Sequence, residues 1–231
     1  MQYIEKLNWE PTDWNVWFTV TIDGRAPFRT WNFRERQGFP DGEIDLVKQC
    51  LIDEQNALCA YCQKRIDLKN SSVDHLLPHS LNSIFSTNYH NLVAVCKDSS
   101  VIEGKAHCDT VKKSTPHPHL IFWNNALAGE TKSHPYFLTI PYTGQVLAKD
   151  QNEINLKIQI DSFIEILNLD HQHLRDERKE YFDPLYKNFV KMGRTQGINY
   201  CRLQIKEILN KPSQPFRQFL LISLHQLIGT R

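Results

Sequence analysis

Apolar residues recur at three- to four-residue intervals in several parts of the chain, and this spacing lines one face of an α-helix. The first such stretch follows Asp41-Gly42 and consists of Ile44, Val47, Cys50 and Leu51. An Asp-Gly pair directly before an apolar-periodic run is typical of a helix start. We therefore expect a helix that runs to about Ala57 and leads directly into Cys59.

The C-terminal part of the chain predicts further amphipathic helices. One helical face is formed by Leu174, Arg178, Tyr181, Leu185 and Phe189. A break is predicted within it at Asp183-Pro184, because Asp can cap a new helix and Pro fits its first turn. Two more helices are indicated by the sets Tyr200, Leu203, Ile208 and Phe216, Phe219, Leu220, Leu224, Leu227, Ile228. No candidate chemistry stands out in this half.

Between these regions the pattern changes to short strands. Residues 72–76 and 91–96 are rich in branched side chains and are predicted as strands. Residues 108–113 are predicted as a short helix that Pro116 stops. Residues 136–140 and 145–148 flank Pro141-Tyr142-Thr143-Gly144, which is typical of a β-hairpin. The sequence thus predicts an α+β protein with a strand, strand, helix unit near its centre.

Composition limits the classes of function. The chain has 231 residues and a formal net charge of +1, so bulk positive charge cannot hold a polyanion and a local patch must do so. Neither an apolar run of about 18 residues nor a secretory signal is present, and we expect a soluble, cytoplasmic protein without a membrane partner. Three regions are predicted: an arm at 1–40, a core at 41–130 and a mainly helical lobe at 131–231.

The predicted arm is rich in aromatic and basic residues. It holds four of the five tryptophans, and four arginines alternate with phenylalanines at Arg25, Phe28, Arg29, Phe33, Arg34, Arg36 and Phe39. Such a segment suits a packed edge with solvated guanidinium groups, a phosphate contact or a docking surface. The sequence does not separate these alternatives.

Four of the six cysteines fall within one stretch, at Cys59, Cys62, Cys96 and Cys108. Clustered thiols in a reducing compartment more often hold a metal than form disulfides. Cys59 and Cys62 are separated by two residues, a spacing that suits either a zinc knuckle or a redox motif. The presence of a second pair, Cys96 and Cys108, favours zinc. His107 remains an alternative to Cys108. A four-thiolate site leaves no open position, so its zinc would be structural. Cys50 and Cys201 lie in apolar-periodic segments and are predicted to be buried.

Residues 59–113 also carry a second pattern. Asp74-His75 ends the first predicted strand, Asn91 opens the second, and Cys108-Asp109-Thr110-Val111-Lys112 begins the short helix. In this order, and framed by the cysteines, the segment resembles the HNH, or ββα-metal, endonucleases. The resemblance implies a zinc-stabilised ββα-metal core and the hydrolysis of phosphodiester bonds.

Peripheral features extend the resemblance to one branch of that family. The chain begins with Ile4-Glu5-Lys6-Leu7, a helix leads into Cys-Ala-Tyr-Cys, and Asn168-Leu169-Asp170 precedes Leu174. These features are similar to those of the PtuB-like HNH effectors of Septu-type and retron-associated antiviral defence systems. The resemblance implies an ABC-type ATPase (PtuA-like) as partner. In retron versions it also implies a reverse transcriptase with its RNA-DNA hybrid, and the substrate would be DNA or RNA, including tRNA.

Each residue of the pattern suits a step of phosphodiester hydrolysis. A neutral His75 can take a proton from water as general base. Asp74 and Asp109 offer hard oxygen ligands to catalytic Mg²⁺ or Mn²⁺. The family resemblance implies that Asn91 orients the loop of His75, and Lys112, one helical turn from Asp109, would contact a phosphate. Neighbouring strand residues point to opposite faces, so Asp74 and His75 can share a site only where the strand ends.

Less specific interpretations remain open. Asp74 and His75 can form an ordinary polar contact, and the whole core can be a non-catalytic zinc module that binds nucleic acid or an assembly partner. A CxxC oxidoreductase is the third alternative. His79 and His90 are expected at the surface or behind the site, and His117 and His119 in a Pro-rich stretch that ends the short helix.

Overall fold

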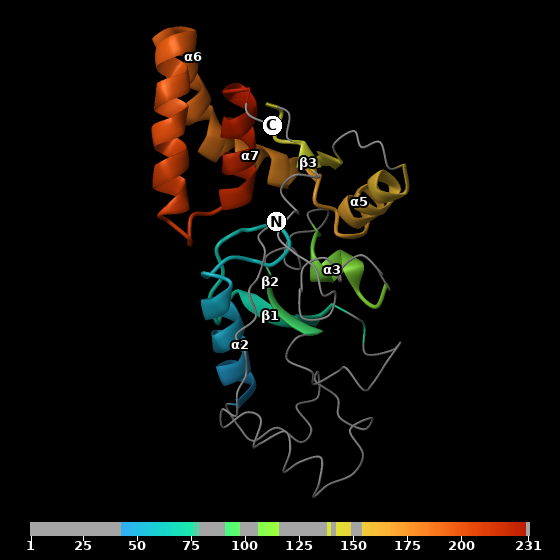
Figure 1. Ribbon diagram of the computed structural model, residues 1–231. Coiled ribbons are helices and arrows are strands. Elements are labelled where there is room, and N and C mark those ends of the chain that lie inside the picture. The colour runs from blue at the N-terminus through green and yellow to red at the C-terminus, as the bar shows by residue number, and fades with distance from the viewer. Residues whose placement is uncertain are drawn as a thin grey trace, which may run out of the picture.

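The computed structural model describes residues 43–76, 78, 91–97, 106–115, 138–139, 142–148 and 154–229. Its elements in chain order are α2 (Glu43–Glu54), β1 (Ser71–His75), β2 (Leu92–Cys96), α3 (Asp109–Lys112), β3 (Leu138–Thr139), β4 (Leu147–Ala148), α5 (Ile154–Ile166), α6 (Gln172–Leu209) and α7 (Arg217–Leu227) (Figure 1). Helices combined with small antiparallel sheets make an α+β architecture, as the sequence predicts. The predicted arm at 1–40 and the Asp41-Gly42 helix start lie outside the described residues.

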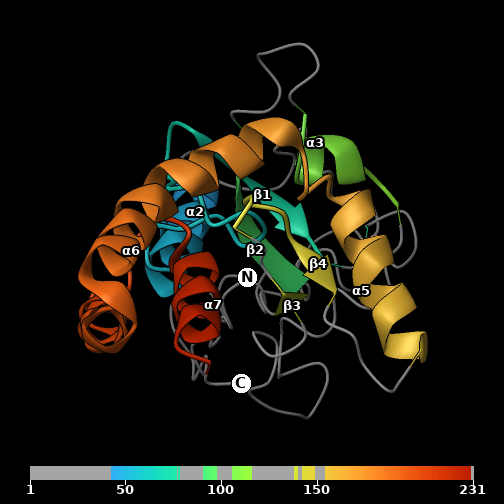
Figure 2. The same cartoon turned by 90° about the horizontal axis from the view of Figure 1, so that it is seen from above.

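The central unit is a two-stranded antiparallel sheet. β1 pairs with β2 in a register that sets Ser71 opposite Cys96 and His75 opposite Leu92. Every residue of β2 is buried, and α2 contributes Val47, Leu51 and Ile52 to the same core. Figures 1 and 2 show α2 and α3 on opposite sides of this sheet. The predicted helix and both predicted strands are therefore confirmed, with small shifts at their ends.

The short helix begins one residue later than predicted. Cys108 has a φ of 57°, which lies in the left-handed region, so α3 starts at Asp109. A residue with a positive φ cannot itself be part of a right-handed helix, so the chain turns sharply at Cys108 and the helix begins with the next residue. After this turn, the Cys108 sulfur lies within 4.8 Å of that of Cys96 at the end of β2, while Asp109 opens the helix. Pro116, predicted to stop it, lies outside the described residues.

The second hairpin is shorter than predicted. β3 and β4 pair over two residues each, with Leu138 opposite Ala148, and Gly144 has a φ of 79° in the turn. A Cβ at Gly144 would lie 2.5 Å from the carbonyl oxygen of Arg175, so the turn packs directly on α6. Helix α5, which the sequence analysis does not single out, lies on one side of this hairpin, and α6 and α7 lie on the other (Figures 1 and 2).

Helix α6 corrects the predicted break at Asp183-Pro184. The helix runs through Pro184 and changes direction at Gly193, which has a φ of 73°. Glycine adopts this conformation at little steric cost, whereas proline disfavours the helix only locally. The two halves of α6 then pack closely, because a Cβ at Gly197 would meet Phe189 at 2.7 Å. The second half packs with α7 around the buried Cys201.

Two side chains assigned to the buried helical face prove to be exposed. Tyr181 is 41% exposed and Leu203 is 59% exposed. The buried positions of α6 are Leu174, Arg178, Phe182, Gly197, Cys201, Ile205 and Ile208. Tyr181 lies three residues after Arg178 and Phe182 lies four after it, and both spacings fit an amphipathic helix. Tertiary packing determines that Phe182 is the buried one. Cys201 is fully buried as predicted, whereas Cys50 is half-buried. None of the helices in the described ranges is long and apolar enough to cross a bilayer.

One side chain completes the outer edge of β2. The Gln55 side-chain amide donates to the Ala94 carbonyl at 2.8 Å, and its Oε1 accepts from the Ala94 amide at 2.8 Å. Gln55 is 2% exposed and thus imitates a neighbouring strand in a dry environment. A buried backbone group that loses its partner costs about 1–3 kcal/mol.

We expect Gln55→Leu to lower the free energy of unfolding by about 1–3 kcal/mol, because the Ala94 amide loses its partner. Urea denaturation monitored by circular dichroism measures the change. Gln49→Leu on the same helix is the control, since the Gln49 side chain donates to the exposed carboxylate of Asp53. Equal effects of the two substitutions would contradict a strand-capping role for Gln55.

Candidate metal centre and active site

Four buried sulfurs meet at one point of the structure. The ligand atoms of Cys59, Cys62, Cys96 and Cys108 all lie within 4.8 Å of one another. The Sγ atoms of Cys62 and Cys96 are 3.6 Å apart, and those of Cys59 and Cys108 are 3.9 Å apart. Four sulfurs bound tetrahedrally to zinc at about 2.3 Å are separated by about 3.8 Å. The spacing of the sulfurs therefore fits a structural zinc ion.

The first two cysteines are held by a tight turn that packs on β2. The Cys59 amide donates to the Lys64 carbonyl at 2.8 Å, and the Gln63 amide donates to the Cys59 carbonyl at 3.1 Å. The Ala60 amide donates to the Ala94 carbonyl of β2. The Cys96 amide in turn donates to the Cys59 sulfur at 3.4 Å. These bonds hold Cys59 and Cys62 beside the end of β2, where Cys96 lies.

Cys108 supplies the fourth sulfur of the cluster, and the His107 ring lies beside it. Nδ1 of His107 lies 3.0 Å from the Cys108 sulfur and 3.8 Å from the Cys96 sulfur, so the ring contacts the cluster from its side. The Cys108 amide donates to the Leu167 carbonyl at 2.8 Å, which anchors this part of the chain to the end of α5. The anchoring explains how Cys108 reaches the site although the chain between Cys96 and Cys108 is long.

The chemistry of the four thiols also fits a cation. Burial raises the pKa of Cys108 well above its usual value, and the adjacent sulfurs of Cys59 and Cys62 raise it further. Such a cluster cannot become fully ionised unless positive charge is bound among the sulfurs. A redox CxxC pair needs an accessible sulfur. Here the four cysteines are 0–4% exposed, which disfavours the oxidoreductase interpretation.

Beside the sulfur cluster lies a buried carboxylate, that of Asp74. Its side chain accepts two hydrogen bonds from the Lys112 ammonium, at 3.0 Å to Oδ1 and 2.9 Å to Oδ2. Oδ1 also accepts from the His75 amide at 2.8 Å, and Oδ2 accepts from the Tyr61 hydroxyl. Lys112 and Asp74 are both buried, so one desolvated ion pair joins β1 to α3. The Tyr61 hydroxyl connects the turn that carries Cys59 and Cys62, here called the cysteine turn, to the same carboxylate.

Tyr61 was missed by sequence reasoning. It lies inside the Cys59-Ala60-Tyr61-Cys62 turn, and its hydroxyl reaches Asp74 across the site. Burial raises the pKa of Tyr61 well above its usual value, and the negative charges of Asp74 and Asp109 raise it further. Tyr61 is therefore a neutral donor at physiological pH. The sequence does show an aromatic hydroxyl between two clustered cysteines. Its hydrogen-bond partner, Asp74, is determined by the tertiary structure.

His75 lies where the strand ends, as the sequence requires. β1 ends at His75, which is half-buried, while Asp74 before it is buried. The next residue, Leu76, donates its amide to the carbonyl of Asn91 at 2.9 Å. Asn91 is fully buried at the start of β2, so its backbone fixes the chain just beyond His75. The side-chain role predicted for Asn91 stays a prediction.

Asp109 is the first residue of α3 and lies near Tyr61, the residue that bonds Asp74. It is half-buried, and its charge acts on the Tyr61 hydroxyl together with that of Asp74. Within the described ranges, the four cysteines form the group of three or more metal-ligating side chains whose ligand atoms lie within 4.8 Å of one another. A catalytic cation shared by Asp74 and Asp109 therefore stays a prediction. His79, His90, His117 and His119 lie outside the described residues.

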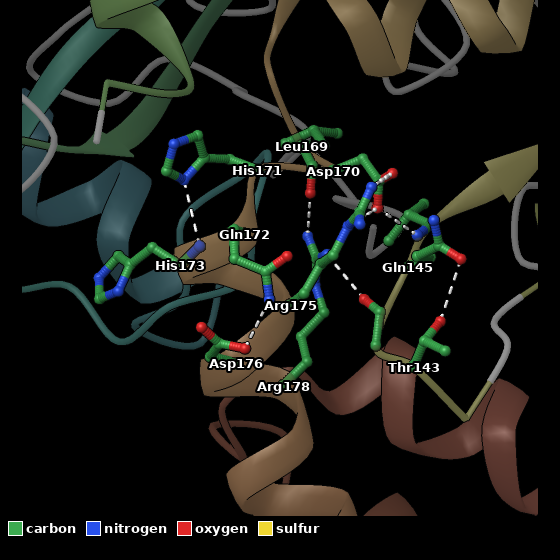
Figure 3. A network of polar contacts seen from close by, with 12 residues as sticks. Thr143, Gln145, Leu169, Asp170, His171, Gln172, His173, Arg175, Asp176 and Arg178 are labelled. Carbon is green, nitrogen blue, oxygen red and sulfur yellow. Dashed lines mark hydrogen bonds and ion pairs between the residues drawn. The ribbon is translucent and has the colours of Figure 1, made fainter. Parts of the chain in front are cut away.

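The Asn168-Leu169-Asp170 segment fastens the site to the helical lobe. The Asn168 side chain donates to the Ala106 carbonyl at 2.8 Å, two residues before Cys108. Asp170 accepts from the Val146 amide and forms an ion pair with Arg175. Figure 3 shows Asp170 and Arg175 beside the chain that leads into α6. This segment therefore connects the chain that leads to Cys108, the β3–β4 hairpin and α6.

Arg178 adds a buried cation to that junction. Its guanidinium donates to the Leu169 carbonyl at 2.5 Å and to the Gly144 carbonyl at 3.1 Å (Figure 3). Burial lowers the pKa of Arg178 to about 10, which leaves it charged at neutral pH. The side chain predicted only as part of an apolar face thus has a polar role, because it satisfies two carbonyls that water cannot reach.

No protein-family model matches the chain. The chain is similar to the CRISPR-associated endonuclease Cas9 of Corynebacterium diphtheriae, with 35% identity over 80 residues. The aligned part covers 35% of this chain and 6% of the Cas9 chain. The chain therefore spans only a small fraction of the length of the relative that it matches.

The two candidate ligands at the fourth metal position can be separated by substitution. We expect Cys108→Ser to lose bound zinc and to lower the melting temperature, because one of the four sulfurs is removed. His107→Ala should keep about one zinc per chain, since four sulfurs already complete a tetrahedral site. Metal analysis of protein purified without oxygen measures both. Zinc retained in Cys108→Ser and lost in His107→Ala would instead identify a site of three cysteines and His107.

Proposed function

We propose that this protein is a metal-dependent endonuclease of the HNH type, which hydrolyses phosphodiester bonds of DNA or RNA. The main support is one arrangement: Asp74-His75 ends a strand that meets α3 through Lys112, beside a four-sulfur cluster. This order of strand, strand and short helix is the one implied by the sequence pattern. The similarity to Cas9, an endonuclease, supports a nuclease function independently.

His75 is the proposed general base. It lies at the end of β1, and the residue is half-buried, between the buried strand and solvent. A neutral imidazole accepts a proton from water near pH 7, which turns the water into a nucleophile. The backbone hydrogen bond from Leu76 to Asn91 holds the chain beside the base. Asn91 is the proposed orienting residue for this loop.

Asp74 and Asp109 are the proposed holders of Mg²⁺ or Mn²⁺, and Lys112 is the proposed phosphate contact. The chain itself already places a positive charge against both oxygens of Asp74, which supports a site built for a cation. Carboxylate oxygens are the ligands that these hard cations prefer. When bound, the cation would neutralise charge on the scissile phosphate. The sulfur cluster keeps a structural role, since a four-thiolate site leaves no open position for substrate.

The cellular role that we propose is that of effector nuclease in an antiviral defence complex with an ABC-type ATPase. A reverse transcriptase with its RNA-DNA hybrid is a further proposed partner, and tRNA a proposed substrate besides DNA. The near-neutral net charge supports a partner that helps to capture substrate, because phosphate contacts supply most non-specific affinity for nucleic acid.

A second candidate function is a non-catalytic zinc module that binds nucleic acid or an assembly partner. One observation favours it: Lys112, Tyr61 and the His75 amide already occupy the oxygens of Asp74. A purely structural carboxylate would have the same contacts. The two functions differ in whether removal of the imidazole changes phosphodiester cleavage.

We expect His75→Ala to reduce Mg²⁺-dependent cleavage to background, because the proposed base is lost while the buried contacts of Asp74 remain. General bases typically contribute 10²–10⁴-fold to rate. Cleavage of labelled single-stranded and double-stranded DNA and of tRNA, with the proposed ATPase present and absent, measures the change. Zinc content and melting temperature should stay close to those of the unsubstituted protein.

His225→Ala is the matched control, because His225 is exposed on α7, far along the chain from the site. It should cleave at the normal rate. Normal cleavage by His75→Ala would exclude the proposed mechanism. Absence of cleavage by every form of the protein, on every substrate, would favour the zinc module.

A further inference from the structure

The ion pair between Lys112 and Asp74 has no spare hydrogen-bonding capacity. The Lys112 ammonium has three donors, and its three contacts are Asp74 Oδ1 at 3.0 Å, Asp74 Oδ2 at 2.9 Å and the His75 carbonyl at 2.7 Å. The carboxylate has about four acceptor positions, and with the His75 amide and the Tyr61 hydroxyl it accepts four hydrogen bonds. A divalent cation cannot bind Asp74 without displacing one of these donors.

Lys112 is the donor that can be exchanged. Tyr61 is held within the cysteine turn, and the His75 amide belongs to the strand that pairs with β2. The Lys112 ammonium stands at the end of a flexible four-carbon stem on a helix of only four residues. It is also the only one of the three donors that carries a charge, so its departure must be matched by the arrival of another cation.

We propose that Lys112 is a stand-in cation for Asp74, which the catalytic divalent cation displaces when it binds. This inference rests on the proposed nuclease function and assigns Lys112 a positioning role within it. Before the metal binds, the ammonium pairs with both oxygens of the buried carboxylate and holds it in place beside His75. An Asp74 without any cation would be a buried, uncompensated charge, which is strongly destabilising.

The exchange reconciles two properties of Lys112. Its ammonium is buried and paired here, yet the sequence pattern predicts a phosphate contact for it. Lys112 lies three residues after Asp109, and residues three apart are neighbours on a helix surface. Once displaced, the ammonium would remain on the side of α3 that carries Asp109. A positive charge released there would lie near the phosphate that the divalent cation binds.

The test is a titration of zinc-loaded protein with Mn²⁺, followed by electron paramagnetic resonance of the free ion. We expect Lys112→Met to bind Mn²⁺ about tenfold or more tightly than the unsubstituted protein, because no ammonium competes for Asp74. Without Mn²⁺, the zinc-loaded variant should melt at a lower temperature than the zinc-loaded unsubstituted protein, and saturating Mn²⁺ should raise its melting temperature by the larger amount.

Two further variants keep the test decisive. Lys113→Met removes the exposed lysine next to Lys112 and should leave Mn²⁺ affinity unchanged. Asp74→Asn with Lys112→Met replaces the ion pair by two neutral groups, which guards against a failure to fold, and it should lose the gain in affinity. Mn²⁺ binding in Lys112→Met that is no tighter than normal, or a gain that persists in the double variant, would overturn the proposal.

These outcomes are separate from those that test the nuclease function. The Mn²⁺ titration needs no substrate and no cleavage. If the unsubstituted protein cleaves nucleic acid but Lys112→Met shows no gain in affinity, the exchange is wrong and the nuclease function stands. If Lys112→Met gains affinity but His75→Ala changes no cleavage, the exchange stands and the role proposed for the cation is wrong.

Discussion

Four sulfur atoms from three distant parts of the chain must meet at one point, and the rest of the central structure depends on this meeting. The sheet beside them has two strands of five residues each, which is less than a sheet needs to be stable alone. A metal bound by the sulfurs would join the turn after α2, the end of β2 and the start of α3. A metal site of this kind contributes directly to the free energy of folding, because the unfolded chain does not assemble it.

The same cysteine turn connects the cluster to the candidate active site and to the helical lobe. Tyr61 extends from the turn to Asp74, so the position of the carboxylate depends on the sulfurs being in place. On its other side, the Gln63 carbonyl accepts from the Phe216 amide, and Gln63 Oε1 accepts from the Gln218 amide at the start of α7. Arg65 donates to the Ser213 carbonyl. Loss of the cluster would therefore disturb both the end of β1 and the contact with α7.

The sequence predicts those features that depend on local pattern. The helix before Cys59, the two strands and the short helix follow from apolar spacing and branched residues, and the grouping of the four cysteines follows from residue type and spacing. What it could not predict depends on distant contacts. Lys112 was expected to face phosphate, but its burial depends on Asp74, which lies 38 residues away. The spacing predicts Arg178 as part of a helical face, whereas its partners Gly144 and Leu169 are brought to it only by the fold. Local sequence predicts a break at Pro184, because it does not show the packing on either side that maintains the helix.

The distribution of charge along α6 changes what the near-neutral net charge means. Between Asp183 and Glu207 there is no acidic residue, whereas five basic residues occur there and all five are exposed: Lys187, Lys191, Arg194, Arg202 and Lys206. The remainder of the chain is therefore net negative. Because exposed charges are screened within about 8–10 Å at physiological salt, a polyanion responds to this local group and not to the sum over the molecule. A formal charge of +1 thus excludes binding by bulk charge, and it leaves the end of the helical lobe with a positive field of its own.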